Sequence, residues 1–135
     1  MSPEVEIYTT CRSANVSPGQ YIEVWATIKN TGTVDLPRGF FVLSVAAGAG
    51  AWCSFESTSS VPPGGTRTFI CQFTDGVPSD WAGRSIDWIV EVWRSKADWE
   101  AGDYSQRWAS AKCYGLLNVS STGYSVSIES MEARA

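Results

Sequence analysis

The chain has 135 residues, which is enough for one domain with a real core and too few for two ordinary ones. Its hydrophobic content is 44%, as in globular proteins, and its formal net charge is -4, with the basic residues scattered, which argues against a nucleic-acid partner. No apolar run approaches the roughly 18 residues that a membrane-spanning helix needs, so we expect no membrane span. Histidine is absent, which removes most routes to a Ser-His or Cys-His nucleophile and to a zinc site.

Seven short segments have the alternation or the composition of β-strands. They are residues 5–11, 21–30, 40–47, 52–57, 66–74, 85–94 and 105–119. Turn residues separate them at intervals of about 8–12 residues, which is typical of an antiparallel sandwich. The best helical candidate, residues 98–112, lacks a helical period and contains Gly102, so no helix is expected.

The second segment alternates cleanly between apolar and polar side chains. The face expected in the core carries Ile22, Val24, Ala26 and Ile28, and the opposite face carries Glu23, Trp25, Thr27 and Lys29. The pattern therefore places Trp25 on the solvent side of its strand, among charges.

Two further strands carry tryptophans on both faces. In residues 85–94 the inward set is Ile86, Trp88, Val90 and Val92, and the outward set is Asp87, Ile89, Glu91 and Trp93. In the last strand we expect Trp108 outside with Ser110 and Lys112, and Ala109, Ala111 and Cys113 inside. Trp93 and Trp108 would then share one outer face near the loop that holds Trp99, while Trp25 would lie on the opposite sheet.

Outward-facing tryptophans allow three interpretations. They can stack on sugar rings, as an indole plane suits their C–H faces, which makes Trp93, Trp99 and Trp108 the candidate saccharide residues. They can anchor a protein partner, and with Trp25 the candidate binding residues number four. A long loop or the chain terminus can instead cover them.

The four cysteines are Cys11, Cys53, Cys71 and Cys113, and none forms a CxxC pair. The even count, the wide spacing and the lack of histidine favour two disulfides in an oxidising compartment, hence an extracellular or cell-surface location, over four free thiols. Of the three pairings, we favour Cys11 with Cys113, joining the first and last strands. The other bridge, Cys53 with Cys71, would close a loop of about 18 residues and contribute about 3 kcal/mol.

Three acidic residues, Asp98, Glu100 and Asp103, lie in one predicted loop. Oxygen ligands on a loop suit calcium, which is the only cofactor we weigh, although acids in a loop are more often solvated surface. A glycosidase pair would need carboxylates on both sides of a cleft, and the sequence shows no sign of one. We therefore expect a protein that is not an enzyme.

The sandwich is expected over residues 1–120, with residues 121–135 as a separate C-terminal segment. Tyr124, Val126 and Ile128 alternate with polar residues there, as in a strand. This strand could add to its own sheet, open a following domain, or pair with the edge of another molecule.

Two Pro-Gly pairs and one Asn-x-Gly triplet carry a family resemblance. Pro18-Gly19 precedes the strand that ends at Asn30-Thr31-Gly32, and Pro63-Gly64 precedes a second alternating strand. Pro-Gly sets a tight turn, and Asn-x-Gly supplies residues that tolerate positive φ. Over residues 5–119 the pattern resembles CARDB, the cell-adhesion-related domain of bacteria and archaea, although four cysteines and seven tryptophans depart from it.

The resemblance implies an immunoglobulin-like or fibronectin-III-like sandwich that serves as a building block of secreted and cell-surface proteins. It implies adhesion or spacing through protein contacts or self-assembly, and no reaction. The alternative from another class is a carbohydrate-binding module, with a polysaccharide as the partner and the outward tryptophans as its contacts.

Overall fold

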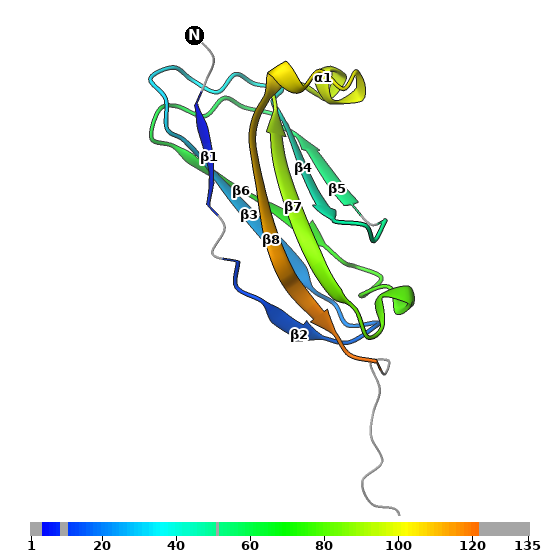
Figure 1. Cartoon of the computed structure of the whole chain (residues 1–135). Helices are drawn as coiled ribbons and strands as arrows, with labels where there is room; N and C mark the ends of the chain where they lie inside the picture. Colours follow the sequence, from blue (N-terminus) through cyan, green and yellow to red (C-terminus); the bar gives the residue numbers. More distant parts are fainter. Residues whose placement is uncertain (1–3, 9–10, 51, 122–135) are drawn as a thin grey trace, which may run out of the picture.

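Two β-sheets pack face to face in the computed structural model, which describes residues 4–8, 11–50 and 52–121 (Figure 1). The three-stranded sheet has the order β1-β3-β6, formed by Val5–Tyr8, Glu23–Asn30 and Thr66–Gln72. The five-stranded sheet has the order β2-β8-β7-β4-β5, formed by Ala14–Val16, Arg107–Val119, Ser85–Trp93, Phe41–Ala46 and Trp52–Glu56. The fold is the predicted all-β, immunoglobulin-like sandwich.

One strand was not predicted. Residues 14–16, which fall between two of the predicted strands, form β2. This strand pairs in parallel with the end of β8 through Ala14 opposite Leu117 and Val16 opposite Val119. Every other pairing within the two sheets is antiparallel. The strand-like segment at residues 124–129 lies outside the described residues.

The predicted faces of β3 and β7 are confirmed. Ala26 and Ile28 are fully buried, whereas Trp25 keeps 62% of its surface exposed. On β7 the inward set from Ile86 to Val92 is buried, and the indole Nε1 of Trp88 donates a 2.8 Å hydrogen bond to the Ser44 hydroxyl. The alternation along these two strands therefore predicted the correct core side.

Both Pro-Gly pairs form the expected tight turns. The Gln20 amide donates to the Ser17 carbonyl, the Gly65 amide donates to the Pro62 carbonyl, and the intervening Gly19 and Gly64 have φ of 85° and 77°. Proline second and a positive-φ glycine third define type II turns.

The Asn-x-Gly triplet works differently from the expectation. Gly32 is not at positive φ; a Cβ there would make a tight contact, 3.0 Å from the backbone nitrogen of Glu4, so glycine favours the close approach of the two segments. Asn30 is fully buried, and its amide nitrogen donates to the carbonyls of Val34 and Val61 while its side-chain oxygen accepts from the Gly32 amide. The motif is a hydrogen-bonded corner built on a buried asparagine.

The two disulfides form in the predicted pairing. Cys53 on β5 is bonded to Cys71 on β6, which joins the two sheets along one side of the sandwich. Cys11, between β1 and β2, is bonded to Cys113 on β8. Each bridge therefore crosslinks segments that belong to different sheets or connect them.

Short helical turns interrupt two connections. A 3-10 turn, η1 (Ser79–Trp81), precedes β7, and α1 (Lys96–Glu100) and η2 (Tyr104–Gln106) lie between β7 and β8. The expectation of no helix is therefore wrong for α1, which begins after Ser95 at a Ser-x-x-Asp capping pattern. None of the helices in the described part of the chain is long and apolar enough to cross a membrane.

Candidate functional site

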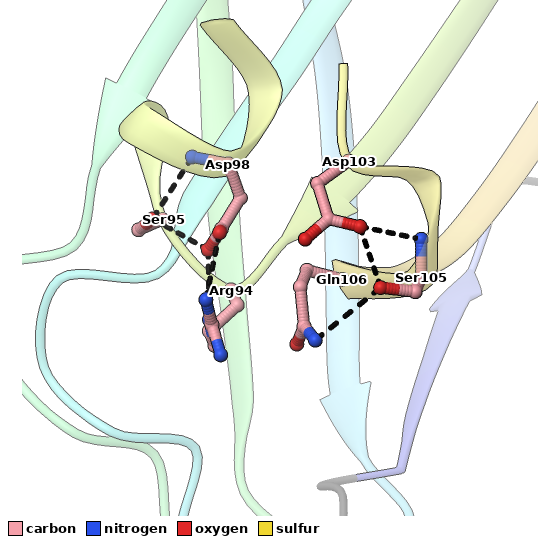
Figure 2. Close-up of polar contacts among 6 residues, drawn as sticks. All are labelled: Arg94, Ser95, Asp98, Asp103, Ser105 and Gln106. Atoms are coloured by element: carbon pink, nitrogen blue, oxygen red, sulfur yellow. Dashed lines mark hydrogen bonds and ion pairs between the residues drawn. The ribbon is translucent and has the colours of Figure 1, made fainter. Parts of the chain in front are cut away.

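The connection between β7 and β8 is held in a fixed shape by its polar side chains (Figure 2). The guanidinium of Arg94 donates two hydrogen bonds, of 2.8 and 2.7 Å, to the Asp98 carboxylate. The Ser95 hydroxyl donates to the same carboxylate at 2.6 Å and accepts from the Asp98 amide. In η2, the Asp103 carboxylate accepts from the amide and hydroxyl of Ser105.

The three acidic residues of the predicted calcium loop each contact a residue of the loop itself. Asp98 pairs with Arg94, Glu100 lies 3.9 Å from the Lys96 ammonium, and Asp103 caps η2. Across residues 4–8, 11–50 and 52–121, no three acidic, cysteine or histidine side chains are grouped so that they could hold a metal ion. Hydrogen bonds from Arg94 and Ser95 lower the pKa of Asp98. The acids stabilise the loop, and the geometry gives no support to calcium coordination.

Trp93 lies on the predicted outer face but is only 2% exposed. It forms a buried cluster with Phe41 and Leu43, and the Tyr104 ring of η2 packs 5.4 Å from it. The loop between β7 and β8 therefore covers Trp93, which was the third interpretation of the outward tryptophans. A covered indole cannot stack on a sugar, so Trp93 leaves the candidate set.

Trp108 does not share the outer face with Ser110 and Lys112, and this expectation is wrong. The pairing of β7 with β8 shifts between Val92, opposite Ala109, and Trp93, opposite Arg107. The irregularity reverses the alternation, so that Trp108 packs against the main core beside Ala109. Arg107 takes the outward position, with its Nη1 3.0 Å from a Glu91 carboxylate oxygen.

Trp99 remains partly accessible and has a partner that sequence reasoning missed. It stacks on Phe41 with ring centroids 5.2 Å apart, and Trp52 of β5, 56% exposed, lies 6.1 Å away. We define the aromatic patch as Phe41, Leu43, Val45, Trp52 and Trp99. The patch contains a hollow of about 310 Å³, lined by Leu43, Val45, Ala46, Gly50, Trp52 and Trp99. The sequence did contain a signal for an outward Trp52, because Trp52 and Ser54 alternate with Cys53 and Phe55 along the strand.

Trp25 belongs to a separate surface on the three-stranded sheet, as predicted. Its indole Nε1 donates to a Glu23 carboxylate oxygen at 3.0 Å, and the Tyr21 hydroxyl donates to the other oxygen at 2.7 Å. Gln72 on β6 donates to that second oxygen at 3.4 Å. The hydrogen bonds from Tyr21, Trp25 and Gln72 lower the pKa of Glu23. The hydrogen bond between Tyr21 and Glu23 also raises the pKa of Tyr21. We call Tyr21, Glu23, Trp25 and Gln72 the Glu23 array.

A cavity of about 530 Å³ opens beside the Glu23 array, between β3 and β8. Its apolar lining includes Val24, Trp88 and Leu117. Glu23 and Arg12 bring opposite charges to the same lining. The two sides of the sandwich therefore differ: an apolar patch on one sheet, and a mixed polar and aromatic surface beside a cavity on the other.

No protein-family model matches the chain, and no curated protein sequence is similar to it. Among solved structures, the DNA glycosylase AlkC of Pseudomonas fluorescens is 15% identical, with a TM-score of 0.44 over 88% of this chain and 31% of that chain. A β-glucosidase from Listeria innocua is 14% identical, with a TM-score of 0.43 over 87% of this chain and 16% of that one. The chain thus spans less than a third of these two proteins.

A third similar structure is the ASH or PapD-like domain of human CEP192. It is 14% identical, with a TM-score of 0.41 over 90% of this chain and 87% of that domain. Similarities of this strength carry no information on the activity or the partners of the present chain.

Proposed function

We propose that the chain is a non-enzymatic structural or adhesive module of a secreted or cell-surface protein, and that it associates with a second copy through the aromatic patch. The observation that carries this proposal is Trp52, 56% exposed beside the partly buried Trp99 and the apolar side chains of β4. This role agrees with what the CARDB resemblance implies, and membership of that family is part of the proposal. The two disulfides support an oxidising, extracellular location.

The energetics favour contact between like surfaces. Transferring the exposed part of a Trp52 side chain from water would contribute about 2 kcal/mol. In a twofold symmetric contact each copy supplies the same patch. The apolar area buried in the dimer is therefore twice that of one patch. The cost of association offsets much of this gain, so the expected complex is weak and depends on concentration.

The acidic side chains near the patch support a non-enzymatic role. Asp98 is committed to Arg94 and Glu91 to Arg107, so both carboxylates serve ion pairs that hold the loop and the strands. Acid–base or nucleophilic work would require such groups to converge on a substrate in a cleft. The patch instead offers a surface suited to protein contact.

Sedimentation velocity over a concentration series tests the association. The wild-type chain should shift to a dimer as its concentration rises toward about 1 mM, where an association worth about 4 kcal/mol becomes visible. Trp52→Ser and Trp52→Glu should both stay monomeric. Tyr114→Ser is the matched control, because Tyr114 is 77% exposed on β8 but lies outside the patch. A monomeric wild type at all concentrations, or a Trp52→Glu variant that still dimerises, would overturn the proposal.

A further inference from the structure

The Glu23 array fixes two exposed aromatic side chains in place. One carboxylate accepts from the Trp25 indole and from the Tyr21 hydroxyl, at 3.0 and 2.7 Å, although these two rings are 62% and 52% exposed. Hydrogen bonds at an exposed site contribute little to stability, and ordering the side chains costs rotamer entropy. The consequence of such an arrangement is preorganisation: a ligand that meets the Trp25 ring finds it already positioned.

The array retains hydrogen-bonding capacity for a ligand. A carboxylate has about four acceptor positions, and the described contacts of Glu23 use three: one on Oε1 and two on Oε2. Oε1 can therefore accept from a ligand hydroxyl next to the indole. Two residues beyond Trp25 on β3, the hydroxyls of Thr27 and Thr68 share a 2.8 Å hydrogen bond and add exposed polar groups.

The charges beside the array favour a neutral ligand. Glu23 and Arg12 line the same cavity with opposite signs, so neither a strongly anionic nor a strongly cationic ligand is selected. A phosphate chain would meet the Glu23 carboxylate and a net charge of -4. The cavity of about 530 Å³ falls in the size range of small-molecule sites, which is about 300–1,000 Å³.

We infer that the surface around Trp25 binds a neutral saccharide, with a sugar ring stacked on the indole, a hydroxyl donating to Glu23 Oε1, and the cavity accepting the adjacent part of the ligand. An indole plane offers the flat apolar surface that the C–H face of a pyranose requires, and the flanking carboxylate, amide and hydroxyl groups match its polar rim. This site lies on the three-stranded sheet and is independent of the association through the aromatic patch.

Isothermal titration calorimetry with defined oligosaccharides tests this inference. The probes are cellohexaose, laminarihexaose and mannohexaose as neutral ligands, with polygalacturonate and choline chloride as charged ones. We expect saturable binding of at least one neutral hexasaccharide and none of the charged probes. Trp25→Ala should weaken that binding by about tenfold or more. Glu23→Gln should weaken it less, and Trp25→Phe should retain part of the affinity because a ring remains.

Trp52→Ala is the matched control, because it removes an indole of similar exposure, 56% against 62%, from the opposite sheet. It should leave the saccharide titration unchanged, and Trp25→Ala should leave the sedimentation behaviour unchanged, so either proposal can fail alone. The absence of binding by all three neutral hexasaccharides would overturn the inference. Binding that disappears in Trp52→Ala but persists in Trp25→Ala would also overturn it, as would a response to choline or polygalacturonate only.

Discussion

Asn30 shows how one side chain can hold several turns of a sandwich together. It is fully buried at the end of β3, where its amide reaches the carbonyls of Val34 and Val61 and the amide of Gly32. Val61 also accepts from the Leu36 amide, in the bridge between Leu36 and Val61. The side chain therefore ties the end of β3 to two connections between the sheets.

Replacing Asn30 by alanine should destabilise the protein by about 2 kcal/mol, because a fully buried side chain loses three hydrogen bonds, one of them the buried bond to the Val61 carbonyl. Urea unfolding followed by tryptophan fluorescence, under non-reducing conditions, measures the change. Asn15→Ala is the control, since Asn15 is exposed on β2, and it should stay within about 0.5 kcal/mol of wild type. Equal midpoints for the two variants would show that the Asn30 hydrogen bonds do not stabilise the corner.

The sequence identified the position of Asn30 but not its role. By sequence alone, the triplet from Asn30 to Gly32 indicates a place where the backbone tolerates positive φ. A buried amide and an exposed one are identical in sequence, and the carbonyls it meets come from residues 34 and 61. Burial and partners of a polar side chain depend on distant segments, so only the fold could assign them.

At the scale of elements, α1 and η2 act as a cover for the outer face of the five-stranded sheet. The cover is held at one end by the Arg94–Asp98 pair and contributes Trp99 and Tyr104, which pack on Phe41 and Trp93. The shape of this connection therefore decides how much of the aromatic patch is open to a partner.

Acid should weaken this cover. Because Arg94 and Ser95 lower the folded-state pKa of Asp98, the unfolded chain takes up the proton at a higher pH than the folded chain. The stability that Asp98 contributes is present above its unfolded pKa of about 3.9 and is lost as the pH falls through its folded pKa. Glu23, whose pKa is also lowered, acts in the same direction.

The free energy of unfolding, measured by urea titration from about pH 5 to pH 3, should therefore fall with pH in the wild type. Asp98→Asn should flatten this dependence. Arg94→Gln should flatten it less, because Asp98 loses the main partner that lowers its pKa and keeps the hydrogen bond from Ser95. A wild-type slope retained in both variants would contradict the assignment of this pH dependence to the Arg94–Asp98 pair.

Most strands were predictable because their apolar and polar residues alternate along the sequence. The three residues of β2 are too few to carry a period, and the five of α1 offer no repeating apolar position. A capping pattern at Ser95 and Asp98 was the one local signal for α1. Short elements are formed by what they pack against, which is why they were missed.

For the molecule as a whole, two disulfides crosslink the sandwich and close loops of very different length. The Cys11–Cys113 bridge spans 102 residues, and the Cys53–Cys71 bridge spans 18. In the loop-entropy account, a longer closed loop removes more freedom from the unfolded chain. The bridge that joins the ends of the domain should therefore be the more stabilising one.

Removing each bridge by a double alanine substitution tests this order. Cys11→Ala with Cys113→Ala should cost about 4.7 kcal/mol, and Cys53→Ala with Cys71→Ala about 3 kcal/mol. Chemical unfolding of the two variants beside the wild type gives both values in one experiment. A larger loss for the Cys53–Cys71 deletion would mean that local packing between β5 and β6, rather than loop closure, sets the contribution of these bridges.

Alternation along the chain was sufficient to assign the core side of β3 and β7, because successive side chains of a regular strand point to opposite faces. The sequence by itself also determined that Trp25 is turned outward, and it favoured the disulfide pairing that the fold contains. Which of the outward tryptophans meet solvent depends on the packing of the whole fold. Trp93 is covered by a distant part of the chain, and Trp108 is turned inward by an irregular strand pairing. Exposure depends on every segment that packs nearby, and a local pattern does not contain that information.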